Sequence, residues 1–265
     1  MSPGIIDIGY TELCFGLFFI LMAGIASFVH ALKLERDLFI GTLRTFAQLF
    51  LLGYILKIIF DIDRMPLVLL VFLFMIFFAA WTIYGRINEK EISFFLPTFF
   101  SMTISFFFVT AMVTTVIVGV KPWWKPQYFI PIGGMVIGNS MNAIAISLER
   151  LLGDLRSKRK EIEMKLCHGA DYKEASRDVL RDAMRAGMIP SINSMMAVGV
   201  VFIPGMMTGQ ILAGANPVEA IKYQIVVMVM IVGATTMGTL SVVLIVRKLC
   251  FGKSHQLILR DGKKG

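Results

Sequence analysis

The sequence contains few charged residues and few cysteines. Only 17% of its 265 residues are Asp, Glu, Lys or Arg, a smaller share than an ordinary soluble domain carries. The three cysteines, Cys14, Cys167 and Cys250, lie far apart without CxxC spacing, so neither a disulfide framework nor a zinc site is expected. The chain also lacks a GxxxxGK[ST] motif, which argues against a P-loop of its own. Because no nucleophile–base pair or cluster of metal ligands stands out, we do not expect an enzyme.

Long apolar runs are what the sequence does contain. Apolar residues make up 57% of the chain, and they fall in runs of about 20 residues, the length that crosses a bilayer core as a helix. The runs are continuous, whereas a transmembrane barrel needs alternation. Prolines separate several of them, at Pro66, Pro122, Pro126 and Pro217. We therefore expect an all-α integral membrane protein, a single domain over 1–265, with seven transmembrane helices near residues 11–32, 39–60, 67–84, 93–119, 131–148, 188–212 and 223–246.

The distribution of basic residues predicts the orientation. The basic residues that give the chain its net charge of +8 cluster between and after the apolar runs. They lack the aromatic–basic interleaving that is typical of nucleic-acid binding. Counting Lys and Arg in the flanking segments places twenty on one side and five on the other, which predicts an external N-terminus and a cytoplasmic C-terminus. The first run has no basic segment before it and no small-residue cleavage site, so we expect it to be retained as a span. The predicted location is a bacterial inner membrane.

One polar stretch, residues 149–187, interrupts the apolar pattern. Its apolar residues recur at near-helical spacing among charges, so it should be helical and lie at or beyond the membrane surface. A helix, a break at Gly169, a short helix from about Asp171 and then Pro190 give it the layout of a coupling loop in an ABC permease. An amphipathic helix resting on lipid headgroups is the alternative. The residues expected to contact an ATPase are His168, Gly169, Ala170, Asp171, Glu174, Ala175 and Arg177.

Several segments together resemble the FetB-like family of ABC transporter permeases, described as iron exporters with plant relatives linked to aluminium tolerance. The resemblance covers nearly the whole chain. It implies a permease that pairs with a separate ATP-binding subunit, as two permeases and two ATPases, with ATP-Mg bound by the partner and no cofactor on this chain. The segments that carry it are Leu34–Asp37, Arg44–Leu49, Gly53–Lys57, Ala79–Trp81, Ile130–Asn142, Ile189–Ser194, Pro204–Gly209 and Asn216–Gln224.

Polar groups inside the expected spans are candidates for a translocation pathway, because such groups are costly in hydrocarbon and normally face the bundle interior or water. Arg44 and Gln48 lie one turn apart, and hydrogen bonding between helices explains them equally well. Met135, Asn139, Asn142 and Glu149 share one helical stripe that would line a path or pack helices together. Ser191, Asn193 and Ser194 open the sixth span, which Pro204-Gly205 should break. Met135, Met206 and Met207 are candidates for metal ligands, with apolar filling of the bundle as the alternative role of Met.

Three functions fit these features. The first is the membrane subunit of an ABC exporter for iron or another metal cation. The second keeps that architecture but moves a nucleotide sugar or another small solute, which suits the scarcity of carboxylates within the spans. The third is a membrane scaffold that transports nothing, and it would tolerate neutral replacement of Asn139 and Asn142.

Overall fold

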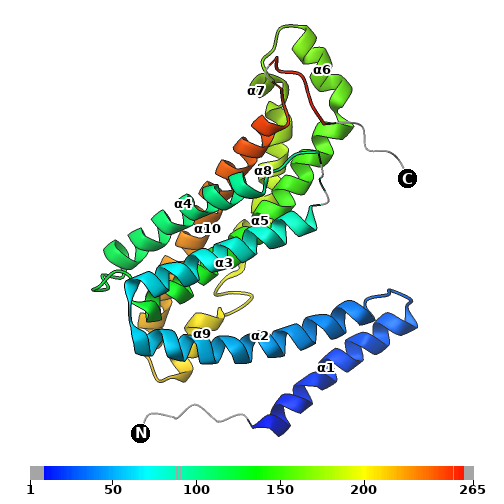
Figure 1. The fold of residues 1–265 in the computed structure, drawn as a ribbon. Coiled ribbons are helices and arrows are strands. Elements are labelled where there is room, and N and C mark those ends of the chain that lie inside the picture. Colours follow the sequence, from blue (N-terminus) through cyan, green and yellow to red (C-terminus); the bar gives the residue numbers. More distant parts are fainter. Residues whose placement is uncertain (1–8, 88, 90, 253, 260–265) are drawn as a thin grey trace.

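The computed structural model describes residues 9–87, 89, 91–252 and 254–259, and these form a helical bundle (Figure 1). Their regular structure is helical apart from two isolated β-bridges, Val198–Phe202 and Phe251–Leu257, which confirms the all-α expectation. The elements in chain order are α1 (Tyr10–Val29), α2 (Glu35–Ile62), α3 (Met65–Arg86), α4 (Phe95–Met112), the π-helical turn η1 (Val113–Ile117), α5 (Pro126–Ser157), α6 (Arg159–Cys167), α7 (Tyr172–Ala175), α8 (Arg177–Ala197), α9 (Gly205–Leu212) and α10 (Pro217–Leu249).

Prolines set several helix starts. Pro66, Pro126 and Pro217 occupy the first turns of α3, α5 and α10, where a missing backbone N–H costs little. The side chain of Asn216 caps α10 by accepting a hydrogen bond from the Val218 N–H at 2.9 Å. These three breaks were therefore placed correctly from the sequence.

Helix α5 is the centre of the bundle, in contact with α3, α4, α8 and α10. Its Phe129, Ile144 and Leu148 are fully buried. Glycines allow the closest helix approaches: a Cβ built on Gly187 of α8 would lie 2.0 Å from Ser147 Oγ on α5. Such backbone-to-backbone packing is typical of membrane helices, where there is little hydrophobic force between them.

Helix α1 stands away from this bundle (Figure 1), and of the α1–α2 hairpin the last turns of α2 pack on the core, through Leu56, Ile59 and Phe60. Among the hairpin's described side chains only Ser27 and Ile59 are buried. The hairpin turn is held locally, since Ser27 Oγ donates to Glu35 Oε1 at 2.8 Å and accepts the Leu34 N–H at 3.0 Å. The rest of this chain therefore covers little of the hairpin's apolar surface.

Six of the described helices are long and apolar enough to cross a membrane: α1, α2, α3, α4 with η1, α5 and α10. The sixth expected span, 188–212, is not one helix. It comprises the last part of α8, an irregular segment over 198–204 and the short α9. The break follows from the sequence, because Gly199 has a φ of +81° and Pro204 precedes Gly205 at the start of α9.

The polar stretch expected over 149–187 is helical, as predicted, but its boundaries differ. It begins inside α5 and ends inside α8. With 32 residues, α5 is about 48 Å long, so its last turns extend past a hydrocarbon core of about 30 Å. Helices α6 and α7 therefore lie at the tip of two long helices, which we call the α6–α7 end of the bundle.

The opposite tip is the α9 end. There the start of α5 (Gln127, Tyr128), α9 (Met206, Gln210) and the start of α10 (Tyr223) line one pocket with the end of the α4–η1 helix. The chain between α5 and α10 therefore passes along the whole bundle through α8 and α9.

Candidate functional site

The α6–α7 element is built by two local devices. Gly169 ends the turn after α6 with a φ of +95°, a conformation that favours glycine because a Cβ strains it. Asp171 and Glu174 then form a capping box on α7: Asp171 Oδ1 accepts the Glu174 N–H at 2.7 Å, and Glu174 Oε2 accepts the Asp171 N–H at 3.2 Å. The predicted glycine break and short helix are both confirmed.

The residues expected to meet an ATPase divide by exposure. His168, Gly169, Glu174 and Arg177 are exposed, Ala170 and Asp171 are half-buried, and Ala175 is buried. His168 Nδ1 also lies 2.7 Å from the Met164 carbonyl oxygen, so this side chain closes the end of α6. The exposed members form a surface that another protein could reach, whereas Ala175 belongs to the core.

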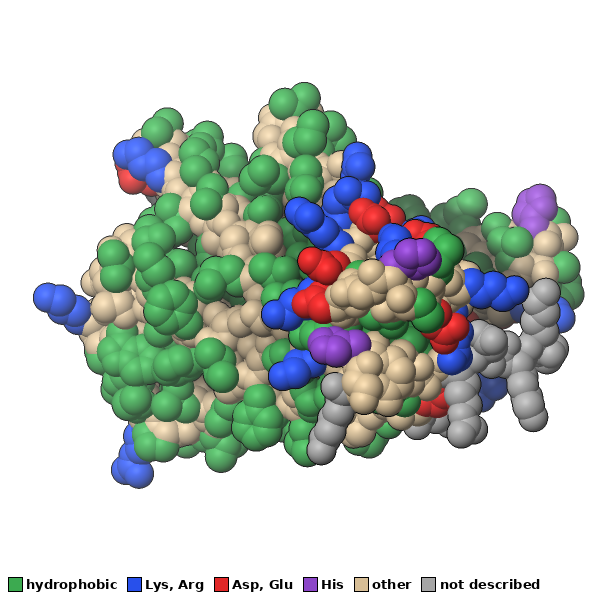
Figure 2. Space-filling view, turned by 90° about the horizontal axis from the view of Figure 1, so that it is seen from above, with side chains coloured by type: hydrophobic (Ala, Val, Ile, Leu, Met, Phe, Trp, Pro, Cys, Tyr) green, Lys and Arg blue, Asp and Glu red, His purple; other side chains and the backbone are tan. Residues whose placement is uncertain are grey.

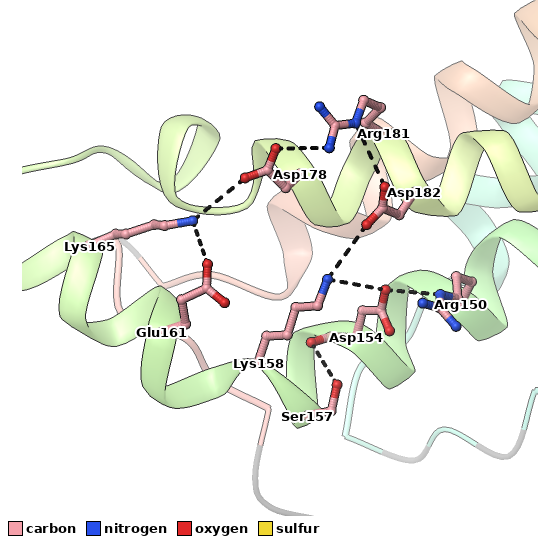
Figure 3. A network of polar contacts seen from close by, with 9 residues as sticks. All are labelled: Arg150, Asp154, Ser157, Lys158, Glu161, Lys165, Asp178, Arg181 and Asp182. Atoms are coloured by element: carbon pink, nitrogen blue, oxygen red, sulfur yellow. Dashed lines mark hydrogen bonds and ion pairs between the residues drawn. The ribbon is translucent and has the colours of Figure 1, made fainter.

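A network of ion pairs ties α5, α6 and α8 together beneath this surface (Figure 3). Lys158 bridges Asp154 at 3.9 Å and Asp182 at 3.6 Å, while Lys165 bridges Glu161 at 2.8 Å and Asp178 at 3.7 Å. The hydrogen bond that Lys165 donates to the Glu161 carboxylate raises the pKa of Lys165 above its usual value. Single exposed pairs contribute little, but a network fixes the relative position of three helices.

A further ion pair links α5 to the connection between α3 and α4. Glu89, in the connection between α3 and α4, forms a hydrogen-bonded ion pair with Arg156 of α5. The Glu89 side chain is buried at 2% exposure and that of Arg156 is 31% exposed. Figure 2, seen from the α6–α7 end, shows charged side chains gathered over this tip and apolar ones over the surrounding helices.

The segment after α10 also packs on α7. The ring of Tyr172 lies 5.5 Å from those of Phe251 and His255, and the Arg247 guanidinium sits 5.7 Å from the Tyr172 centroid. Arg159 Nη1 donates to the Leu259 carbonyl oxygen at 2.7 Å. Burial raises the pKa of the Cys250 thiol to about 12. Sequence analysis missed this cluster, because nothing in the spacing connects Tyr172 with residues about 80 positions later.

The predicted pair Arg44 and Gln48 lies in one groove of about 550 Å³, bounded by α2, α3 and α5. Both side chains are exposed in this single chain. Thr45 of α2, Thr82 of α3 and Gly138 of α5 line the same groove. The two side chains therefore lie on one face of α2, as their spacing of four residues predicts, and α5 contributes Gly138 and Met141 to the groove rather than its asparagines.

The expected stripe on α5 is not gathered into one site. Asn139, Asn142 and Glu149 are exposed, whereas Met135 is half-buried and lines the pocket at the α9 end. Asn139 Nδ2 donates to the Met135 carbonyl oxygen at 2.8 Å. Glu149 lies about 35 Å from the start of α5, at the far edge of a hydrocarbon core. Its position suits the surface better than the middle of a path.

The break between α8 and α9 borders two pockets. One, of about 420 Å³, is lined by residues of α8, the 198–204 segment, α9 and α10, including Met207. The other, of about 410 Å³, holds Met135 and Met206 with Gln127 and Gln210. Of the predicted residues at the end of α8, Ser191 is half-buried and Asn193 and Ser194 are exposed; their neighbour Met195 lines the first pocket instead.

Hard metal ligands do not cluster here. In the part of the chain that the structure describes, no group of three or more His, Cys, Asp or Glu side chains could hold a metal ion. The two pockets near the α8–α9 break are lined mainly by apolar side chains, with thioethers and amides among them.

Known proteins match this chain over most of its length. The model of the family described as Uncharacterised protein family (UPF0014) matches residues 10–251. A UPF0014 membrane protein of Synechocystis sp. is 38% identical over 82% of this chain and 83% of its own. The Probable iron export permease protein FetB of Escherichia coli is 34% identical over 96% of both chains. Protein ALUMINUM SENSITIVE 3 of Arabidopsis thaliana is 32% identical over 90% of this chain and 86% of its own. No solved structure matches.

Proposed function

The chain belongs to the UPF0014 family of membrane proteins, and on that premise we propose that it is the membrane-spanning subunit of an ABC transporter that exports iron or another metal cation. The relative named as an iron export permease supports the cargo. A separate ATP-binding subunit supplies the energy and binds ATP-Mg, since this sequence has no P-loop. The whole chain serves as one permease domain in a bacterial inner membrane.

The observation that carries the proposal is the α6–α7 element. An ATPase that closes on nucleotide moves as a rigid body, so its partner must present something stiff. Here the short capped helix α7 follows α6 at the tip of two long helices. Ion pairs hold Lys158, just before α6, and Lys165, near its end, to α8. The Tyr172 ring of α7 packs on Phe251 just after α10. A push on α7 would be transmitted to three helices that enter the bundle.

We infer that the chain crosses the membrane seven times, with the N-terminus outside. Six passes are the continuous helices, and the broken pair α8 and α9 is the remaining one, because it joins opposite ends of the bundle. An odd number of passes places the N-terminus and the basic C-terminus on opposite sides. The excess of Lys and Arg at the α6–α7 end favours the cytoplasm for that end.

We infer further that two copies pair within a complex of two permeases and two ATPases. The exposed hairpin and the open groove beside Arg44 and Gln48 support this arrangement. Arg44 lies nine residues into α2, about 14 Å along the helix, so lipid contact there would be costly. A second copy, or water in a path between copies, would give Arg44 and the exposed asparagines Asn139 and Asn142 a polar neighbour.

The test is transport of iron into inverted vesicles that contain this chain and an ATP-binding subunit. ATP-dependent accumulation of labelled iron above a control with an inactive ATPase is the expected result. Hydrolysis that depends on this chain but moves no iron would contradict the cargo while keeping the ABC assignment. The small-solute alternative would then come first, since no cluster of hard ligands is found among the described residues.

A further inference from the structure

The larger part of the α8–α9 break faces a cavity. The pocket of about 420 Å³ is lined by Val198, Gly199, Ile203 and Pro204 of the irregular segment. Discontinuous membrane helices of this kind form ion and substrate sites in transporters, because irregular backbone at membrane depth is tolerated where it lines a cavity. Among the described residues, none donates a backbone hydrogen bond to the carbonyl oxygens of Gly199 or Ile203.

Three methionines from three different helices line this cavity: Met195 of α8, Met207 of α9 and Met228 of α10. Methionine is often a flexible filler of gaps between helices. If these methionines only filled a gap between helices, little space would remain, yet a cavity lies beside all three side chains. Their flexibility would instead let the thioethers close on a small guest.

Gln224 supplies a further polar group. It lies on α10 one turn before Met228, it is only 6% exposed, and it lines the same cavity. Its Oε1 atom has no hydrogen-bond partner among the described residues. A buried amide oxygen without a partner is costly, because it has lost its hydrogen bonds to water. A bound guest that accepts electron density from this oxygen would remove that cost.

We propose that this cavity is a binding site for a soft monovalent cation of the Cu⁺ or Ag⁺ class, held by the thioethers of Met195, Met207 and Met228 with Gln224 Oε1 beside them. Thioethers select soft ions, whereas Fe²⁺ and harder cations prefer imidazole, carboxylate or water. No lining residue is ionisable, so no negative charge offsets a divalent ion, and a single charge is cheaper to bury. Binding needs only this chain; that the site serves transport rests on the proposed function.

The test is equilibrium dialysis of the purified full-length chain against Ag⁺, with bound silver measured per chain. Ag⁺ is used because it does not change oxidation state under these conditions. Thiols would compete for silver, so the parent carries Cys14→Ser, Cys167→Ser and Cys250→Ala. The site variant adds Met195→Leu, Met207→Leu and Met228→Leu. The matched control adds Met22→Leu, Met196→Leu and Met237→Leu, three exposed methionines that do not line the cavity.

We expect the parent and the control to bind one Ag⁺ that the site variant does not bind. Equal binding by the site variant and the control, or no binding by the parent, would overturn the proposal. If the triple variant does not fold, the single variant Met207→Leu is tested instead. We expect its affinity for Ag⁺ to fall by about 10-fold or more. Because neither ATP nor the ATPase is present, this result is independent of the transport assay.

Discussion

The two ends of the bundle differ in what lies between their helices. At the α6–α7 end, ion pairs join α5, α6 and α8, and Glu89 reaches Arg156 across a buried contact. At the α9 end, two pockets of about 400 Å³ each separate the helices, and their linings are apolar side chains, thioethers and uncharged polar groups. Each end keeps buried atoms without a hydrogen-bond partner, Arg156 Nε and Arg247 Nε at the first and Gln210 Oε1 and Gln224 Oε1 at the second. The two ends therefore differ in the ion pairs that join separate elements at the first.

This difference indicates that the two ends of the long helices have different roles. A stiff end can receive force from another protein, because paired charges and a capped helix resist small displacements. A hollow end with flexible methionines can change shape at little cost. Helices α8 and α10 belong to both ends, so a displacement at α7 would reach the cavity walls through continuous helix over most of the distance.

The largest expected effect comes from Gly187→Ala, where α8 touches α5 most closely. The new Cβ would meet Ser147 Oγ at 2.0 Å and the Ala143 carbonyl oxygen at 2.4 Å. We expect a loss of about 3 kcal/mol in the free energy of unfolding, measured by chemical unfolding in detergent. The matched change at the hollow end, Gly209→Ala in α9, meets nothing within 4 Å and should stabilise by at most about 1 kcal/mol. Equal free energies of unfolding for the two variants would contradict the difference in packing between the α5–α8 contact and the α9 end.

The next effect concerns charge. Glu89→Gln removes the buried carboxylate that pairs with Arg156 and leaves that guanidinium with the more distant Glu91, at 4.0 Å, and we expect unfolding to become easier by about 2–3 kcal/mol. Glu219→Gln, at the start of α10, breaks an exposed pair with Lys222 and should change stability by less than about 0.5 kcal/mol. If Glu219→Gln lost as much stability as Glu89→Gln, burial of an ion pair would not determine its contribution to stability.

Gly169→Val tests whether the stiff end transmits force. A β-branched residue at a φ of +95° should cost about 2 kcal/mol of stability and displace α7. We expect ATP hydrolysis by the complex to continue with much less transport. Gly214→Val is the control, because Gly214 has a φ of +90° between α9 and α10, also with open space around it. It should carry a similar strain and keep hydrolysis coupled to transport; coupling lost in both variants would contradict the assignment.

Much of this arrangement was predictable from the sequence, because it depends on local signals. The starts of three helices follow Pro66, Pro126 and Pro217, and the turn at Gly169 follows from a single glycine. The position of Arg44 and Gln48 on one face of α2 follows from helical periodicity.

The remainder depends on pairings between distant segments. The spacing of Arg150, Asp154 and Lys158 suggests pairs along one helix, but nothing in it points to Asp182 on α8. The contact of Tyr172 with Phe251 and His255 has no sequence signal. The break in the sixth expected span was anticipated at Pro204, yet Met195 and Gln224 became candidates only once the cavity was seen.

The smallest expected effect has the opposite sign. Gln224→Leu removes a buried oxygen that lacks a partner and replaces it with an apolar side chain of similar volume. We expect the unliganded chain to become more stable by about 1 kcal/mol, with weaker Ag⁺ binding. Gln48→Leu, on the exposed face of α2, should change neither property. Chemical unfolding with and without Ag⁺ measures both. A destabilised Gln224→Leu chain would mean that this amide supports the fold, so that the α9 end is held together by polar contacts as the α6–α7 end is. A more stable variant that no longer binds Ag⁺ would mean that Gln224 lowers the stability of the fold and serves ligand binding.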